Sequence, residues 1–131
     1  MPTSPGTRRR RTIKSGTALA PLASPSVHHL DTCSAAMGSD RAVAVILGVS
    51  PSQVSRWRRG QFPDPDNADR LAGLALVTEM LARWLEPQAL EGWLHGVHAH
   101  LGDRSPVYLI GQGRIADVIG AIETEKAGVF A

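Results

Sequence analysis

The 131-residue chain has one cysteine, few aromatic residues and no long apolar run. Cys33, being alone, excludes an internal disulfide and a zinc site built from cysteines, and it fits a reducing cytoplasm. Aromatic residues make up 5% of the chain and hydrophobic residues 43%, a balance that favours helices over β-structure. The longest obvious apolar run, "AVAVILGV" at 42–49, is far shorter than the roughly 18 residues of a membrane span. We therefore expect an all-α, cytoplasmic protein without a membrane segment.

The net charge of +2 conceals a strong asymmetry along the chain. Residues 1–38 carry five bases and one acid, and residues 39–61 carry four bases and one acid. Residues 62–131 carry five bases and ten acids, a net charge of −5. A basic N-terminal part and an acidic C-terminal part predict two different partners, one of them anionic.

Residues 1–25 are rich in Pro, Ser, Thr and Gly and show no hydrophobic periodicity. This composition predicts a flexible basic tail. The run Arg8 to Arg11 fits either a basic arm that follows DNA phosphates or a solvated tail without a role.

Residues 26–65 carry the spacing of a helix-turn-helix lobe that binds DNA. A first helix is predicted over 26–37 with Gly38 at its end, and Ser39 suits the N-cap of "DRAVAVILG". Gly48 permits the positive φ of the turn, and Ser50 followed by Pro51 begins the next helix. The predicted inward positions are Val43, Ala44, Leu47, Val49, Val54 and Trp57.

The second helix of this unit, 51–59, gathers three arginines around one tryptophan. With Val54 and Trp57 facing inward, the opposite face presents polar and basic side chains to a major groove, where Arg binds guanine and Gln binds adenine. Arg58 and the helix N-terminus at Ser50 are better placed for phosphates. The predicted DNA-binding residues are Ser50, Ser52, Gln53, Ser55, Arg56, Arg58 and Arg59. A merely solvated basic face is the alternative.

Residues 66–131 are predicted to form a long linking helix and a second helical lobe. Asp66 or Asn67 is the expected N-cap of the linking helix, whose leucines and other apolar residues form two faces. Two apolar faces on one helix predict packing on both lobes or homodimerisation, which would also match a twofold operator. A helix is expected at 87–96, then a short turn at 105–111 with Ser105 as its cap and Pro106 after it, and a last helix at 113–128 that Gly128 ends.

No catalytic, cofactor or metal site is predicted. His95, His98 and His100 lie close in sequence, but no Cys or acid stands at ligand spacing. The segment "GQGRIADVIG" lacks both the preceding strand and the Lys-Ser/Thr pair of a phosphate loop. We expect a binding protein and not an enzyme.

The last 39 residues carry an ordered set of motifs: a Trp-Leu pair, a later leucine, an "RSP" turn, a glycine, a Val/Ile helix and a terminal "GVF". The matching positions are Trp93, Leu94, Leu101, Arg104, Pro106, Leu109, Gly113, Val118, Ile122, Gly128 and Phe130. This order resembles the C-terminal toxin-binding domain of Xre/MbcA/ParS antitoxins, which also place a helix-turn-helix upstream. The sequence departs from that pattern at Val97–His98, where the family has Pro-Asn.

The resemblance implies one half of a type II toxin–antitoxin module. The usual partner is a RES-domain toxin that consumes NAD⁺, and the antitoxin covers the toxin's active site and represses its own operon. The toxin-binding residues it implies are Arg104, Tyr108, Gly128, Val129, Phe130 and Ala131. The alternatives are a transcriptional regulator whose second lobe only dimerises or senses a ligand, and an interaction module that no longer reads DNA.

Overall fold

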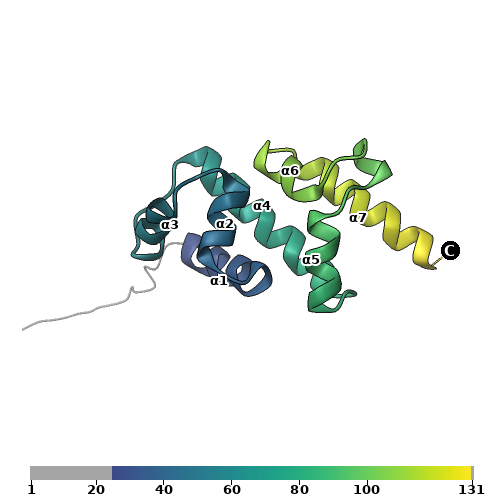
Figure 1. The fold of residues 1–131 in the computed structure, drawn as a ribbon, viewed down its shortest axis with the longest axis horizontal. Helices are drawn as coiled ribbons and strands as arrows, with labels where there is room; N and C mark the ends of the chain where they lie inside the picture. Colours follow the sequence, from purple (N-terminus) through teal and green to yellow (C-terminus); the bar gives the residue numbers. More distant parts are fainter. Residues whose placement is uncertain (1–24, 131) are drawn as a thin grey trace, which may run out of the picture.

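The computed structural model describes residues 25–130, and only the backbone of Val129 and Phe130. The fold is all-α, as predicted, and its one departure in this range is an isolated antiparallel bridge between His98 and Arg104. Figure 1 shows the helix-turn-helix at one end of the molecule and the C-terminal helix at the other. The predicted basic tail and Ala131 lie outside the described residues. The elements are α1 (Pro25–Met37), α2 (Asp40–Leu47), α3 (Pro51–Arg58), α4 (Pro65–Ala82), α5 (Pro87–His95), the 3₁₀ helix η2 (Ala99–Leu101), α6 (Pro106–Gly111) and α7 (Ile115–Phe130).

Local sequence signals fix the helix-turn-helix formed by α2 and α3. Ser39 caps α2 by accepting a hydrogen bond from the Ala42 N–H, and Gly48 ends it with a φ of 72°. Ser50 accepts from the Gln53 N–H to begin α3. The predicted inward residues are buried, except that Val49 is only half-buried. The predicted caps at Ser39 and Ser50 and the predicted helix end at Gly48 are therefore confirmed.

Helix α4 is the central element and joins the two lobes. It packs against α1 on one side and against α7 on the other (Figure 1). The predicted N-cap was wrong: Asp64 caps the helix, since its carboxylate accepts hydrogen bonds from both the N–H and the side-chain amide of Asn67. Pro65 then occupies the first helical position, where a missing N–H has no consequence, so the helix begins earlier than expected.

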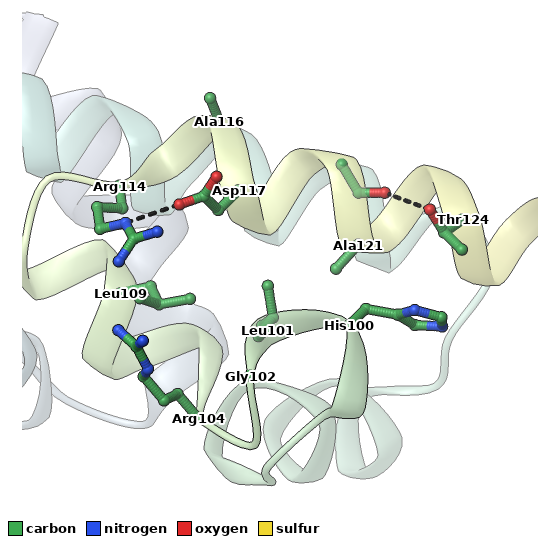
Figure 2. Close-up of a pocket in the computed structure, with 11 residues that line it drawn as sticks. His100, Leu101, Gly102, Arg104, Leu109, Arg114, Ala116, Asp117, Ala121 and Thr124 are labelled. Carbon is green, nitrogen blue, oxygen red and sulfur yellow. Dashed lines mark hydrogen bonds and ion pairs between the residues drawn. The ribbon is translucent and has the colours of Figure 1, made fainter.

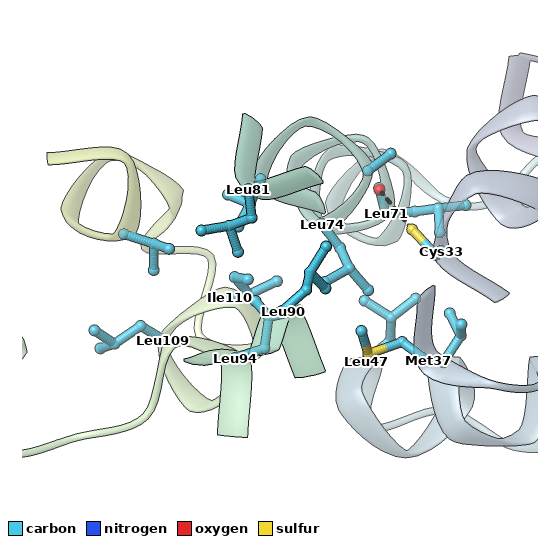
Figure 3. Close-up of a cluster of buried hydrophobic side chains, with 14 of the residues drawn as sticks. Cys33, Met37, Leu47, Leu71, Leu74, Leu81, Leu90, Leu94, Leu109 and Ile110 are labelled. Atoms are coloured by element: carbon cyan, nitrogen blue, oxygen red, sulfur yellow. Dashed lines mark hydrogen bonds between the residues drawn. The ribbon is translucent and has the colours of Figure 1, made fainter. Parts of the chain in front are cut away.

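One hydrophobic cluster runs from the helix-turn-helix into the second lobe. Its members come from α1, α2, α4, α5 and α6 in Figure 3, and include Cys33, Leu47, Leu71, Leu74, Leu81, Leu94 and Ile110. Burial raises the pKa of the Cys33 thiol to about 12, and the charge of Glu79 adds to the effect. The thiol is therefore a packing group and not a nucleophile.

The second lobe consists of α5, η2, α6 and α7. Ser105 caps α6 as predicted, accepting from the Tyr108 N–H. The predicted end of the last helix was wrong, because α7 continues through Gly128 to Phe130. Gly128 does not adopt the positive φ of a helix-ending glycine. A glycine within a helix costs only about 1 kcal/mol relative to alanine, so a helix can pass through it.

Gly73 marks the closest approach of α4 to α7. A Cβ atom at this position would lie 2.4 Å from Ile115 Cδ1 and 2.5 Å from Ile115 Cγ1. We expect Gly73→Ala to lower the free energy of unfolding by about 1–2 kcal/mol, because overpacking outweighs the gain in helix propensity. Gly92→Ala in α5 is the matched control: its Cβ meets nothing within 4 Å, and it should stabilise by about 0.5–1 kcal/mol. Urea unfolding followed by circular dichroism measures both, and equal stabilisation by both variants would contradict this close approach.

Candidate functional site

Helix α3 presents an open polar face at one end of the molecule. Ser52, Ser55, Arg56 and Arg59 are exposed, and Gln53 is half-buried on the flank. Trp57 is 1% exposed, which makes it a core residue and not a base-stacking one. Neither Arg56 nor Arg59 has an acidic partner among residues 25–128, so both guanidinium groups are available to an anionic ligand.

Arg58 is held by acids instead of projecting freely. Its Nε and Nη2 donate to the Asp40 carboxylate at 2.7 and 2.9 Å, and its Nη1 donates to Asp31 at 2.7 Å. Ser34 also donates a hydrogen bond to Asp40. These contacts lower the pKa of Asp40, chiefly through the Arg58 hydrogen bond, and raise that of Arg58. The prediction that Arg58 contacts phosphates is therefore revised: Arg58 ties α3 to α1 and α2 and orients the exposed face.

The Arg58–Asp40 pair predicts a specific pH dependence of stability. Since the folded-state pKa of Asp40 is lowered, its contribution is complete above the unfolded pKa and disappears as the pH falls through the folded pKa. Both side chains are about one-third exposed, so we expect Asp40→Asn to cost only about 1 kcal/mol at pH 7. The difference from wild type should shrink below about pH 4 in urea unfolding. Glu123→Gln, at a more exposed pair, should change stability by less than about 0.5 kcal/mol at any pH; a constant Asp40→Asn difference would contradict the assignment.

Helix α6 forms a short ridge between two hollows on the second lobe. On one side lies a hollow of about 370 Å³ of mixed polar and apolar lining between α6 and α2, bordered by Val45 (76% exposed) and Tyr108 (53% exposed). On the other side lies a polar cleft of about 550 Å³ between α6, the turn at 100–104 and α7. The backbones of α6 and α2 come close together, since a Cβ at Gly111 would lie 3.0 Å from the Ile46 carbonyl oxygen. The two lobes are thus in direct contact at this ridge.

A cluster of three side chains fastens the far half of α7 to α5. The indole N–H of Trp93 donates to both carboxylate oxygens of Glu125, at 3.0 and 3.1 Å. The His98 ring lies tilted against Trp93 with ring centroids 4.5 Å apart, and its Nδ1 lies 3.3 Å from Glu125 Oε2. Its Nε2 lies 2.8 Å from the Trp93 carbonyl oxygen. The histidine that departs from the family pattern therefore has a structural partner on the last helix.

The predicted toxin-binding residues fall in two separate places. Arg104 lines the polar cleft, and Tyr108 lies beyond it on α6. Gly128 to Phe130 form the end of α7, about 20 Å from Asp117 at the helical rise of 1.5 Å per residue. Both places lie away from α3 (Figure 1). The predicted DNA-binding face and the predicted toxin-binding residues therefore lie on different parts of the molecule.

Sequence reasoning missed Arg114 and Asp117 as lining residues of the cleft. Asp117 had the pattern of a solvated face residue, yet it accepts a hydrogen bond from Arg114 Nε at 2.7 Å. Their spacing of three residues at the start of a helix signals the pair, but nothing in the sequence signals that the turn at 100–104 lies opposite.

Among the described residues no group of three or more His, Cys, Asp or Glu side chains could hold a metal ion. His95, His98 and His100 do not converge on one point there. No helix in the same range has the length and apolar content to cross a membrane.

Comparison with known proteins decides the family. No family model matches the chain. A probable mycobacterial cidal antitoxin of Mycobacterium tuberculosis is 34% identical over 88 residues, which are 67% of this chain and 76% of that relative. The mycobacterial cidal antitoxin MbcA of Mycobacterium bovis is 34% identical over 89 residues, 67% of this chain and 79% of the relative. The chain belongs to the mycobacterial cidal antitoxin family.

The predicted membership of a type II toxin–antitoxin module is thereby confirmed. A chain in the crystal structure of the M. tuberculosis MbcT–MbcA toxin–antitoxin complex has the same fold as this antitoxin, with a TM-score of 0.64 and 29% identity. The match covers 84% of this chain and 97% of that one. It therefore spans both lobes and is not limited to the helix-turn-helix, a motif common to many unrelated regulators.

Proposed function

We propose that the antitoxin binds a cognate RES-domain toxin, one that consumes NAD⁺, and neutralises it by covering its active site. The observation that carries this proposal is the match of 97% of a chain from the MbcT–MbcA toxin–antitoxin complex. The antitoxin acts by binding and not by catalysis.

The surface of the second lobe supports this role. Residues 62–131 carry a net charge of −5, which would speed encounter with the basic entrance of a pocket that binds an anionic nucleotide. The α6 ridge offers the exposed ring of Tyr108, and aromatic anchors contribute much of the affinity at protein interfaces. Glu125 of α7 is held by a hydrogen bond from Trp93, and the end of the helix that follows it would reach the active site of the toxin.

A second activity, binding to operator DNA and autoregulation of the operon, is proposed for α3. Arg56 and Arg59 are exposed and free of acidic partners among the described residues, and Ser52, Gln53 and Ser55 share their face. We propose that the antitoxin binds as a homodimer, because a twofold operator needs two reading helices. The apolar residues of α4 do not themselves argue for a dimer, because Val77 is fully buried and Leu76 is the one large apolar side chain of the helix that is exposed.

Coexpression tests the main proposal. The RES-domain toxin encoded beside the antitoxin gene is induced alone or with the full-length antitoxin, and growth and cellular NAD⁺ are measured. We expect the toxin alone to deplete NAD⁺ and the antitoxin to restore both growth and NAD⁺, with the two proteins copurifying. Copurification without rescue would contradict neutralisation, and the absence of a complex would contradict the function itself.

A transcriptional regulator without a toxin partner is the alternative. The exposed side chains of Val45 and Tyr108 beside the α2–α6 hollow favour it, because exposed large apolar groups suit contact between two copies of the chain. In that case the antitoxin would dimerise and bind the promoter but leave the toxin active.

A further inference from the structure

The polar cleft beside α6 brings two arginines together over an apolar floor. Arg104 lies in the turn that follows η2, and Arg114 is the residue immediately before α7. Both side chains extend into the cleft (Figure 2). Both guanidinium groups point toward Leu109, which is 1% exposed. Two guanidinium groups directed at one buried leucine place several N–H donors where an anion could accept from both.

The two arginines differ in what already satisfies them. Arg114 donates to Asp117 only through Nε, at 2.7 Å, so its two terminal nitrogens have no partner within the described part of the chain. The guanidinium of Arg104 has neither a hydrogen bond nor an ion pair within residues 25–128. The cleft therefore presents several N–H donors without an acceptor. The charge of Arg114 is partly compensated by Asp117, and that of Arg104 is not compensated.

The backbone that carries Arg104 is firmly held in an unusual conformation. Gly102 and Asp103 adopt left-handed φ values of 67° and 60° in succession, and Asp103 is the only non-glycine residue with positive φ in the described range. The His98 carbonyl oxygen accepts a hydrogen bond from the Asp103 N–H at 3.0 Å, and the His98 N–H donates to the Arg104 carbonyl oxygen at 3.2 Å. A non-glycine residue in this region costs about 1 kcal/mol or more, and such strain concentrates at functional sites. Here it turns Arg104 back toward α7.

We propose that this cleft receives a carboxylate of the toxin, an Asp or Glu side chain that inserts between Arg104 and Arg114. The inference rests on the proposed function, since it names the chemistry with which the second lobe recognises its partner. Guanidinium groups form paired hydrogen bonds with carboxylates, and Arg104 has all its donors available. Asp117 would remain bound to Arg114 Nε and keep its terminal nitrogens directed into the cleft.

The surroundings favour a protein carboxylate over other anions. A nucleic acid would meet the net charge of −5 on residues 62–131, and helices α6 and α7, which border the cleft, lie away from α3 (Figure 1). A free anion at two solvent-exposed arginines gains little, because water screens the interaction. A carboxylate delivered by a docked protein displaces that water, and the pair then becomes considerably stronger.

The test measures toxin affinity by isothermal titration calorimetry with full-length antitoxin variants. Arg104→Glu should weaken binding by about 100-fold or more, and Arg104→Ala by about 30-fold, the loss typical of removing one partner of a desolvated charge pair. Arg83→Glu is the matched control: it makes the same change of charge at an exposed arginine after α4, outside the cleft, and should alter affinity less than about threefold. Since Arg104 is exposed and its side chain is unpaired, its variants should fold like wild type by circular dichroism.

A second arm identifies the source of the anion. Each exposed Asp or Glu of the toxin is changed to Arg, and one such change should restore the binding of Arg104→Glu at least tenfold. Inorganic phosphate and acetate are titrated into the antitoxin alone while the arginine Nε–H signals are followed by NMR, and neither should saturate below about 10 mM. Saturation by phosphate well below that concentration, with no restoring toxin variant, would identify a free-anion site and overturn the proposal.

The remaining outcomes separate this inference from the proposed function. If wild-type antitoxin binds the toxin and Arg104→Glu binds as tightly as Arg83→Glu, the carboxylate contact is overturned while toxin binding stands. If wild-type antitoxin does not bind the toxin at all, the proposed function fails and the inference fails with it.

Discussion

Replacing Arg56 and Arg59 together by alanine should lower operator affinity by about 100-fold or more without loss of structure. Both side chains are exposed on the outward face of α3. An arginine bound to a base edge contributes about 1–3 kcal/mol, and the two lie on the same face of one short helix. Fluorescence anisotropy at a fixed salt concentration, with operator and scrambled DNA, measures the loss, which should be larger for the operator.

Arg58→Ala is the informative comparison for this variant. Because the Arg58 guanidinium is occupied by Asp40 and Asp31, the substitution should lower thermal stability while changing the salt dependence of DNA binding little. An equal loss for operator and scrambled DNA in the Arg56/Arg59 variant would indicate phosphate contact only. Unchanged affinity would remove α3 from the proposed DNA-binding surface.

Removing residues 128–131 should abolish neutralisation of the toxin while leaving the fold and DNA binding nearly intact. The hydrogen bonds that join α7 to Trp93 of α5 come from Glu125, so the shortened helix keeps them. Residues at a chain end usually contribute little to stability, and we expect a change below about 0.5 kcal/mol. The proposed role of Val129 and Phe130 as anchors in the toxin's active site predicts the loss of function.

Growth and NAD⁺ during coexpression with the toxin measure this effect. The shortened antitoxin should still copurify with the toxin through the α6 ridge but fail to restore growth. Glu123→Ala provides a control on the same helix, since this exposed residue makes only a 3.5 Å surface pair with Lys126 and should rescue like wild type. Full rescue by the shortened form would show that neutralisation does not depend on the C-terminal end.

The ends and buried positions of α2 and α3 were predictable because each depends on neighbours in sequence. Ser39, Gly48 and Ser50 act on backbone groups within a few residues, and the period of an α-helix places Val54 and Trp57 on the buried side. Where two local signals competed, the prediction failed. Asp64 takes the N-cap that Asp66 or Asn67 could have filled, and α7 continues past Gly128.

By itself the sequence determined the all-α class, which residues of α3 are exposed and, through ordered motifs, the antitoxin family. Only the tertiary structure decided the roles of charges that meet across the chain. Arg58 binds Asp31, 27 residues away, and Glu125 binds Trp93, 32 residues away. Arg104 faces Arg114 because a left-handed turn at Gly102 and Asp103 reverses the chain beside α7. The interaction between two charged side chains depends on the distance between them in space. The number of residues between them predicts that distance only when both lie on the same helix.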